Sequence, residues 1–391
     1  MHLLEQLALS TGVKISDPFI ETNYYPLVFD KYIVLENGSE IPSRSYGMWN
    51  DVIQEIKPYL DENKISIVQI GDQKDQLIPH AYDLRGKTTQ KQIAYLLKKC
   101  LLHCSTNDFL LDIASSFKIP VVGMYGNTFA DIAKPYWAEE SKSVILESHR
   151  NGDKPTFLAD ENPRTINFIN PEEISNSILK LLKIKFKNNK KTRFIGKNYF
   201  SHVLEVVPDF LPPASFNTDL IINLRMDYHF DLDNLLQWGS NKKINIFTNK
   251  IIDLNYLNAI KKNIVAIQQE VCTNLNQKYL NVLKSLQIPC ATFTKNERAL
   301  GNLRMKYFDN QVNFLKDQTF DDFQTKSKKA FSPDVNLYYQ SNKLLLSKGK
   351  KYLTKYDYIN NRDYSGKDLR VVNSADFWAD QDHLRVYEKK S

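Results

Sequence analysis

The chain has 391 residues, 42% of them hydrophobic, and a formal net charge of +7. A chain of this length can bury two cores, because a single core usually stops growing at roughly 250–300 residues. No apolar run reaches the roughly 18 residues that a membrane helix needs, and the first residues lack the layout of a signal peptide. The four cysteines are too few for a disulfide framework. We therefore expect a cytoplasmic protein without a membrane span.

Residues 31–190 alternate short apolar runs with helical patterns, which predicts βαβ units and a parallel sheet. The expected strands are 31–36, 65–71, 100–106, 120–126 and 143–148, and the expected helices are 49–63, 89–100, 108–117 and 171–186. Turn residues follow several of these strands, at the edge where open α/β sheets bind ligands. An N-terminal segment, residues 1–30, precedes this first domain.

A second α/β series follows a proline-rich stretch, which we interpret as part of a linker over residues 191–214. Its expected strands are 218–226, 243–249, 263–271 and 288–296, its expected helices are 232–240, 253–263 and 276–287, and a further strand is possible at 304–310. The fold class predicted is α/β with two Rossmann-like domains, residues 31–190 and 215–313. Residues 314–391 are aromatic and lysine-rich, and their segments 336–359, 371–378 and 382–389 predict a small β-rich extension.

The most specific pattern is DLRGKTTQKQIAYLLKKCLLHCSTNDFLLDIASSFKIPVVGMYGNT, residues 83–128. It resembles the donor-binding domain of the ADP-heptose heptosyltransferases, glycosyltransferase family nine. The matching residues are Asp83, Leu84, Gly86, Lys87, Thr88, Asn107, Asp108, Ala114, Pro120, Val121, Val122, Gly126 and Thr128. The resemblance covers roughly residues 31–185. It implies a two-domain GT-B fold, a nucleotide-sugar donor and a sugar transfer that needs no cofactor or metal ion.

A nucleotide diphosphate is an anion that backbone N–H groups at glycine turns and helix N-termini can bind. We expect the donor at the strand-end loops, on Asn37, Gly38, Ser39, Arg44, Gly71, Lys87, Thr106, Asn107, Asp108, Gly126, Asn127 and Thr128. Taken singly, polar residues such as Asp108 are more often helix caps than ligand contacts. The hypothesis therefore depends on several loops meeting at one edge of the sheet.

Two departures from the family leave alternatives open. In an alignment without gaps, Phe109 and Leu110 replace the Gly-Pro pair of the family motif, and Asp112 falls where the family usually has histidine. An alignment with one deletion instead matches Asp108 to the aspartate of the motif. The glycine and the histidine are missing in both alignments. An inactive binding or structural protein is one alternative, since backbone without that glycine cannot approach a phosphate as closely. The family also places its acceptor domain first, so this chain would have a permuted GT-B arrangement.

The candidate catalytic residues are Arg225, Asp227 and His229, directly after the strand expected at 218–226. A sugar transfer needs a general base near the acceptor hydroxyl, and Asp227 is the first choice with His229 as the alternate. Arg225 can offset negative charge on the leaving diphosphate. The competing interpretation is a polar loop in which an aspartate caps the helix that begins LDNLL. Less specific strand-end candidates are Glu270, Lys295, Asn296 and Glu297.

The acceptor stays open among lipopolysaccharide, another glycan, a protein and a modified nucleobase. The basic run from Lys183 to Lys197 and the aromatic residues Tyr338, Tyr339, Trp378 and Tyr387 are the only support for a glycosyltransferase that modifies nucleic acid. A basic run such as Lys183 to Lys197 is more often a solvated helix end and linker than a nucleic-acid site. Cys100, His103 and Cys104 do not share the spacing of a metal site, which favours buried thiols.

Overall fold

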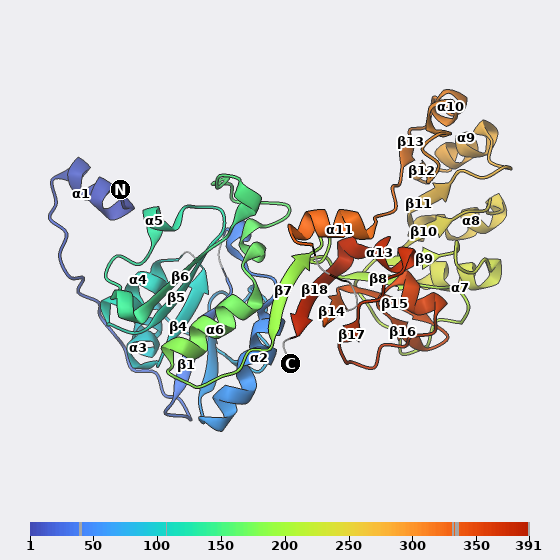
Figure 1. Ribbon diagram of the computed structural model, residues 1–391. Coiled ribbons are helices and arrows are strands. Elements are labelled where there is room, and N and C mark those ends of the chain that lie inside the picture. Colours follow the sequence, from blue (N-terminus) through green and yellow to red (C-terminus); the bar gives the residue numbers. More distant parts are fainter. Residues whose placement is uncertain (39–40, 107, 331, 333–335, 390–391) are drawn as a thin grey trace. The chain divides into compact units, whose positions relative to one another are not determined.

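The chain forms two compact units, Met1–Lys191 and Thr192–Ser391, in a computed structural model (Figure 1). The structure describes residues 1–38, 41–106, 108–330, 332 and 336–389. Both units contain parallel sheets with helices, so the predicted α/β class is confirmed. None of the described helices has the length and apolar character needed to cross a bilayer. The expected GT-B-like arrangement of the two units stays a prediction.

Unit 1 contains one six-stranded sheet in the order β3-β2-β1-β4-β5-β6. Its strands are β1 (Tyr32–Glu36), β2 (Ser66–Ile70), β3 (Tyr82–Asp83), β4 (His103–Thr106), β5 (Val121–Tyr125) and β6 (Ser143–Glu147). All neighbouring strands are parallel. This is the strand order of doubly wound dinucleotide-binding domains. In such a sheet the first strands are added on one side of β1 and the later strands, from β4 on, are added on its other side.

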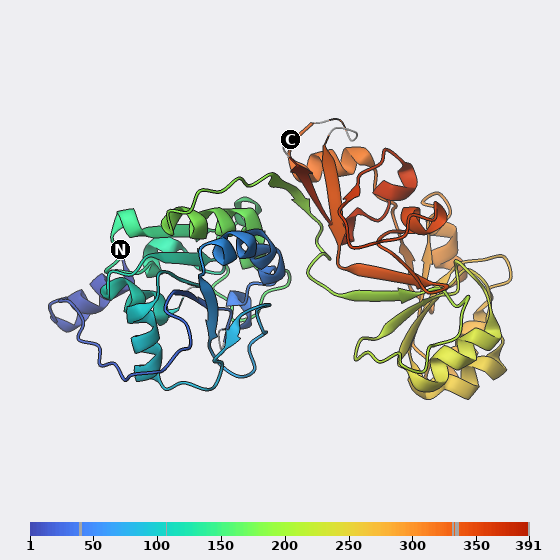
Figure 2. The ribbon, with the colours of Figure 1, turned by 90° about the horizontal axis from the view of Figure 1, so that it is seen from below.

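Helices cover both faces of this sheet (Figures 1 and 2). They are α2 (Trp49–Glu62), α3 (Gln90–Lys99), α4 (Phe109–Ser116), α5 (Ala130–Ala133) and α6 (Pro171–Leu181). Helix α1 (Leu3–Thr11) has no buried residue and does not cover the sheet. Leucines of α3 and α4 pack on Val34 of β1 in one core, and α2 lies beside α6. Local sequence fixes the helix starts, since Thr89 and Gln92 form a capping box at α3.

Unit 2 contains an eight-stranded sheet in the order β13-β12-β11-β10-β9-β8-β15-β16. Its strands are β8 (Val203–Val206), β9 (Ile222–Arg225), β10 (Ile244–Thr248), β11 (Ile264–Glu270), β12 (Cys290–Thr294), β13 (Val312–Phe314), β15 (Lys343–Ser347) and β16 (Lys350–Tyr352). Only β16 pairs antiparallel to its neighbour. From β8 to β13 each strand lies next to the one that follows it in the chain.

The helices between these strands all lie on one face of the sheet (Figure 1). They are α7 (Leu232–Asn241), α8 (Leu254–Ile260), α9 (Gln277–Ser285) and α10 (Leu300–Lys306). Right-handed crossovers between successive neighbouring strands require this placement. The core under the helices contains Leu224, Trp238 and Ile246, all with no exposed surface.

The C-terminal residues form a second, four-stranded sheet in the order β17-β14-β18-β7. Its strands are β7 (Lys190–Ile195), β14 (Leu337–Ser341), β17 (Leu369–Arg370) and β18 (Leu384–Lys389), accompanied by α11 (Phe320–Ser327), α12 (Lys355–Ile359) and α13 (Ala375–Trp378). Phe323, Tyr339, Phe377 and Trp378 fill its core. Tyr339 and Trp378, two of the aromatic residues that could have stacked on nucleobases, are thus buried in this core.

Three expectations differ from the structure. The presumed linker, residues 191–214, holds most of β7 and all of β8, which join two different sheets. The β-rich extension is not separate either, because β15 pairs with β8 in the large sheet. The possible strand at 304–310 overlaps α10, and 371–378 contains α13, because apolar spacing in such short segments does not distinguish a helix from a strand.

Candidate functional site

The carboxyl ends of β1 and β4 lie side by side at the point where the strand order of unit 1 reverses. After β1 the chain continues to α2, and after β4 it continues to α4 on the other face of the sheet. Open α/β sheets bind their ligands in the crevice at such a switch point. Of the predicted donor residues, Asn37, Arg44, Thr106 and Asp108 belong to these two connections. Ser39 and Asn107 lie outside the described residues.

The N-terminus of α2 differs from the other helix starts at this edge. Asp108 caps α4 and Glu147 accepts a hydrogen bond from Ala130 N–H of α5 at 2.9 Å, while α6 begins with a capping box. Met48, the N-cap residue of α2, gives no side-chain hydrogen bond to the first turn. Carboxylates thus accept hydrogen bonds from the first N–H groups of α4 and α5, whereas the first turn of α2 carries one carboxylate, Asp51, and no capping side chain, so its N–H groups can attract an anion.

Arg44 adds a positive charge just before α2. It ends a short 3-10 helix, Pro42–Arg44, and lies near Tyr125 at the end of β5. A guanidinium next to the N-terminus of a helix is suited to a phosphate, because both present N–H donors and positive charge. Together these groups form the cationic side of the candidate site.

Two predicted donor residues, Asn37 and Asn127, have side chains that bind the protein itself. Asn37 is 2% exposed and its Oδ1 accepts from Tyr46 N–H at 3.1 Å. Asn127 is 3% exposed and its Nδ2 donates to Ser43 Oγ at 2.8 Å and to Leu158 O at 2.9 Å. Their side chains hold the loops of the site together, and neither amide is presented to solvent.

Three buried side-chain oxygens at this edge have no hydrogen-bond partner among the described residues. They are Glu36 Oε2 at the end of β1, Thr106 Oγ1 at the end of β4 and Asn127 Oδ1 after β5. Buried polar atoms normally have a partner, either protein or water. Hydroxyl or amine groups of a ligand, or ordered water, would satisfy them.

Carboxyl groups form the other side of the site. Burial, together with the carboxylates of Asp108 and Asp75, raises the pKa of Glu36 well above its usual range. Asp75 fills the space beside Gly38 and Gly71, where an added Cβ would lie within 2.3 Å of its carboxylate. The sequence analysis missed Glu36 and Asp75, although a carboxylate at the end of the apolar strand YIVLE was a usable signal. Carboxyl groups repel phosphate and accept hydrogen bonds from hydroxyls.

The remaining predicted donor residues do not converge on one point. Lys87 donates to the backbone oxygen of Asp83 at 2.9 Å and is exposed, while Thr128 is half-buried. Gly71 has a φ of +131°, which favours glycine for conformational reasons alone. The site retained for a ligand is therefore the switch point around Glu36, Arg44, Thr106 and the start of α2.

Gly126 contacts protein backbone closely, which changes its expected role. A Cβ added there would lie 2.5 Å from Ile166 N and 2.7 Å from Ile166 Cα. A bulky residue at position 126 should therefore disturb folding as well as any ligand, so Gly126 has a packing role besides the donor-binding role expected from the sequence.

We expect Gly126→Ala to lower the free energy of unfolding by roughly 1–3 kcal/mol, the usual cost of overpacking. Urea unfolding of the full chain measures it. Gly301→Ala is the matched control, because a Cβ at Gly301 in α10 meets no atom within 4 Å. Equal stability of both variants would contradict the close packing of Gly126 on Ile166.

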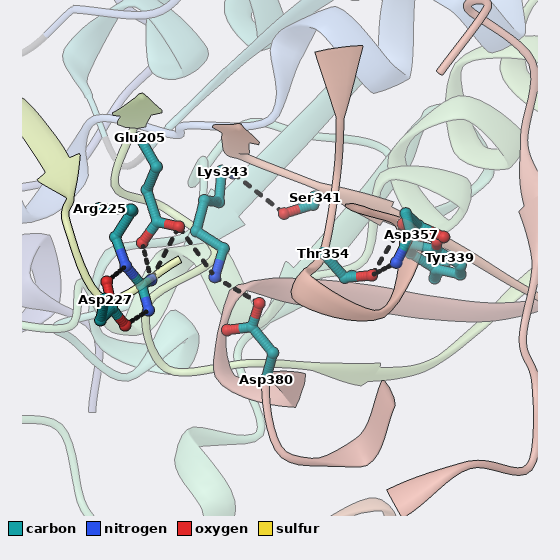
Figure 3. Close-up of polar contacts among 9 residues, drawn as sticks. All are labelled: Glu205, Arg225, Asp227, Tyr339, Ser341, Lys343, Thr354, Asp357 and Asp380. Carbon is teal, nitrogen blue, oxygen red and sulfur yellow. Dashed lines mark hydrogen bonds and ion pairs between the residues drawn. The ribbon is translucent and has the colours of Figure 1, made fainter. Parts of the chain in front are cut away.

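In unit 2, Arg225 and Asp227 belong to a largely buried ion network (Figure 3). The Arg225 guanidinium donates to both Asp227 oxygens, at 2.8 and 2.6 Å, and to both Glu205 oxygens at 3.0 Å. It also lies 3.9 Å from the centroid of the Tyr228 ring. Lys343 extends the network by pairing with Asp380 and, at 3.9 Å, with Glu205. Both oxygens of Asp227, the first-choice base, thus already accept hydrogen bonds.

His229 is more accessible than its neighbours in this loop. Its side chain is 49% exposed, and its nearest carboxylate oxygen, Asp231 Oδ2, lies 4.0 Å from Nε2. Asp231 caps α7 by accepting from Asn234 N–H at 2.9 Å, as the alternative interpretation of the loop predicted. The loop therefore combines a structural cap with an accessible imidazole.

Two of the less specific strand-end candidates, Lys295 and Asn296, have structural partners. Lys295 lies 3.3 Å from Asp317, and Asn296 Oδ1 accepts from Ala299 N–H at 3.2 Å. His103 is fully buried with Cys100 and Cys104 as neighbours in sequence, and burial lowers its pKa to about 4. In the described part of the chain, no three His, Cys, Asp or Glu residues form a group that could hold a metal ion.

The basic run from Lys183 to Lys197 includes β7, an edge strand of the four-stranded sheet. Lys191 in β7 is exposed, as are Lys183, Lys185, Lys187 and Lys197 outside it. Lysine on an edge strand prevents pairing with other chains. This structural role accounts for Lys191 without a nucleic-acid ligand.

Comparison with known proteins gives structural matches only. No family model matches the chain, and no curated protein matches its sequence. A glycosyl transferase family 9 protein from Veillonella parvula is 18% identical over 46% of this chain and 50% of its own, with a TM-score of 0.33. E. coli ADP-heptose LPS heptosyltransferase II is 18% identical over 40% and 48%, with a TM-score of 0.32.

E. coli heptosyltransferase WaaC, solved with ADP, is 14% identical over 45% of this chain and 54% of its own, with a TM-score of 0.30. The chain therefore spans about half the length of these solved structures.

Proposed function

We propose that unit 1 binds a nucleoside diphosphate sugar and that the chain transfers this sugar to an acceptor hydroxyl. The observation that carries the proposal is the strand order of unit 1, which brings the loops after β1 and β4 to one switch point. Two of the residues that match family-nine glycosyltransferases, Asn107 and Asp108, directly follow β4 in the sequence. Fold similarity alone would not support an activity, so the chemistry of the loops matters more.

The charges of the site suggest how the donor lies. The diphosphate would bind at the first turn of α2 and Arg44, because the opposite side carries carboxyl groups. Ribose or sugar hydroxyls would bind to Glu36 Oε2 and to Thr106 Oγ1, two atoms that lack a hydrogen-bond partner in the described residues. The sequence-based expectation placed the diphosphate at the loops around Asn37–Ser39, Thr106–Asp108 and Gly126–Thr128, so the proposal keeps the connection after β1 and moves the phosphates away from the other two loops.

The transfer itself needs a base and a stabilised leaving group. The acceptor oxygen forms a bond to the anomeric carbon while the bond from that carbon to the diphosphate oxygen breaks. The diphosphate leaves with the electron pair, and Arg44 can stabilise its negative charge. The acceptor proton passes to a base, for which we propose His229 ahead of Asp227, because the Asp227 oxygens already bind Arg225.

A second candidate function is nucleotide-sugar binding without turnover. The carboxyl groups of Glu36, Asp75 and Asp108 at the switch point favour it, as do the missing glycine and histidine of the family motif. Release of free sugar or transfer to any acceptor would exclude this alternative, while tight nucleotide binding without either would support it.

The donor site is tested by thermal unfolding with ADP, UDP, GDP and CDP. A ligand that binds only the folded state at 100 times its dissociation constant adds about 2.7 kcal/mol of stability. We expect one of them to raise the Tm, and Arg44→Ala to weaken its binding by roughly 10–100-fold through loss of a charge-assisted contact.

Arg298→Ala is the control, because Arg298 is exposed in unit 2. No shift with any nucleoside diphosphate would overturn the proposed function. Equal affinity of the Arg44→Ala variant and the wild type would instead remove Arg44 from the phosphate site.

A further inference from the structure

Among the described residues, one face of the large sheet in unit 2 is not covered by helices over β10 to β12. Over β8, β15 and β16 the same face is covered by Tyr358 of α12 and by the Lys343–Asp380 pair. Helices α7 to α10 all pack on the opposite face, where Leu224 and Ile246 are buried (Figure 1). Alternate residues of β9 to β12 are therefore only partly buried. Parallel sheets are almost always covered on both faces. A face left open in this way calls for a ligand or partner.

The open face carries amides and phenyl rings, which we call the amide–phenyl strip. It consists of Asn223, Asn245, Phe247, Gln268, Glu270 and Phe293, all half-buried. Neither phenylalanine belongs to a hydrophobic core cluster of the described residues. Asn245 Nδ2 donates to Asn223 Oδ1 at 3.1 Å, which orients both amides. The Gln268 and Glu270 side chains make no hydrogen bond with described residues, so they are available to a ligand.

The two rings are separated by a fixed interval. Phe247 on β10 lies opposite Gln268, Gln268 lies opposite Ala291, and Phe293 follows two residues later on β12. Two strand spacings of about 4.8 Å and two residues of about 3.3 Å place the rings roughly 12 Å apart. The Gln268 and Glu270 side chains lie between them. The strip can therefore stack two rings of one extended ligand and hydrogen-bond the part between.

The charge of the strip selects the kind of ligand. Arg225, which lies 5.2 Å from the Phe247 ring centroid, is already paired with Glu205 and Asp227. Among the described residues of the strip, Glu270 alone carries a charge, and it is negative. Nucleic acid, acidic glycans and anionic lipid surfaces would find no cation here. Neutral sugars fit, because their C–H faces stack on phenyl rings and their hydroxyls bind amides.

We propose that the amide–phenyl strip binds a neutral oligosaccharide. The strip continues towards the loop of His229, because Asp227 N–H donates to Phe247 O at 3.0 Å. An oligosaccharide on the strip would thus place one end beside the base that we propose. Its role as the acceptor rests on the proposed function, whereas its binding to the strip does not.

The test is isothermal titration calorimetry of the full chain with maltohexaose, cellohexaose and chitohexaose, and with hexagalacturonate as the acidic comparison. We expect one neutral hexasaccharide to bind and hexagalacturonate not to bind. Phe293→Ala and, separately, Gln268→Ala should weaken the binding by about tenfold or more, equivalent to about 1.4 kcal/mol. Phe308→Ala is the control, since Phe308 is 79% exposed and lies outside the strip.

The proposal is overturned if no neutral hexasaccharide binds at millimolar concentration, or if binding survives both strip variants. It is also overturned if sedimentation shows a dimer that Phe293→Ala dissociates, because the face would then be an interface between copies. Nucleotide binding is measured on the same samples. Hexasaccharide binding without nucleotide binding would support the oligosaccharide site on the amide–phenyl strip and overturn only the proposed donor site.

Discussion

Replacement of His229 by alanine is expected to lower sugar transfer by roughly 10²–10⁴-fold, the usual contribution of a general base. The side chain is 49% exposed and its nearest carboxylate oxygen is 4.0 Å away, so its removal should leave the stability of the chain unchanged. Initial rates with the nucleotide sugar found by the nucleotide screen measure the effect. His202→Ala is the matched control, because His202 is likewise exposed in unit 2.

Asp227→Asn should behave differently in the same assay. It removes a charge that pairs with the Arg225 guanidinium at 2.6 Å, so we expect a loss of stability and a smaller loss of transfer than in His229→Ala. If Asp227→Asn abolishes transfer in a stable protein and His229→Ala stays active, the carboxylate is the base. Near-normal transfer in both variants would show that the general base is not in this loop, and Glu270 and Glu297 would be the next candidates for it.

Lys343→Met is expected to destabilise unit 2 by about 3–5 kcal/mol, because it breaks a buried ion network. The Lys343 side chain is 5% exposed and pairs with Asp380 and Glu205. With Arg225 and Asp227 included, the network contains three carboxylates and two cations, so loss of Lys343 leaves an excess of buried negative charge. Urea unfolding followed by circular dichroism measures the change.

Lys350→Met provides the control, because Lys350 is exposed on the neighbouring strand β16. In the Lys343→Met background, Asp380→Asn should recover part of the stability, since it removes one of the unpaired carboxylates. A Lys343→Met variant as stable as the control would show that the network contributes little to the fold of unit 2.

The sequence by itself determined most of the local structure of the chain. Apolar runs such as those at β1, β5 and β10 have strand length and β-branched residues, and Thr89 and Asp231 mark helix starts through their own side chains. These signals act over a few residues and do not depend on distant contacts. Where the local signal was short, as in residues 304–310, the prediction was wrong and the residues contribute to α10.

The sequence also pointed to two loops of the candidate site. It identified the loops after β1 and β4, because polar residues that follow apolar strands gather at the carboxyl edge of a parallel sheet. It could not show which of those loops a ligand can reach. Ser43 Oγ donates to Leu158 O across 115 residues of sequence, and Ile166 packs on Gly126. Contacts between segments so far apart leave no local pattern.

Only the tertiary structure decided the charge and accessibility of the candidate residues. Glu36 has a raised pKa because it is buried and because Asp108 and Asp75 lie near it. The Arg225 guanidinium that binds Asp227 is held by Glu205, which comes from the neighbouring strand β8. The open face of β9 to β12 likewise follows from strand order, not from any single strand. Pairing and burial depend on which segments become neighbours, and that information lies in the fold as a whole.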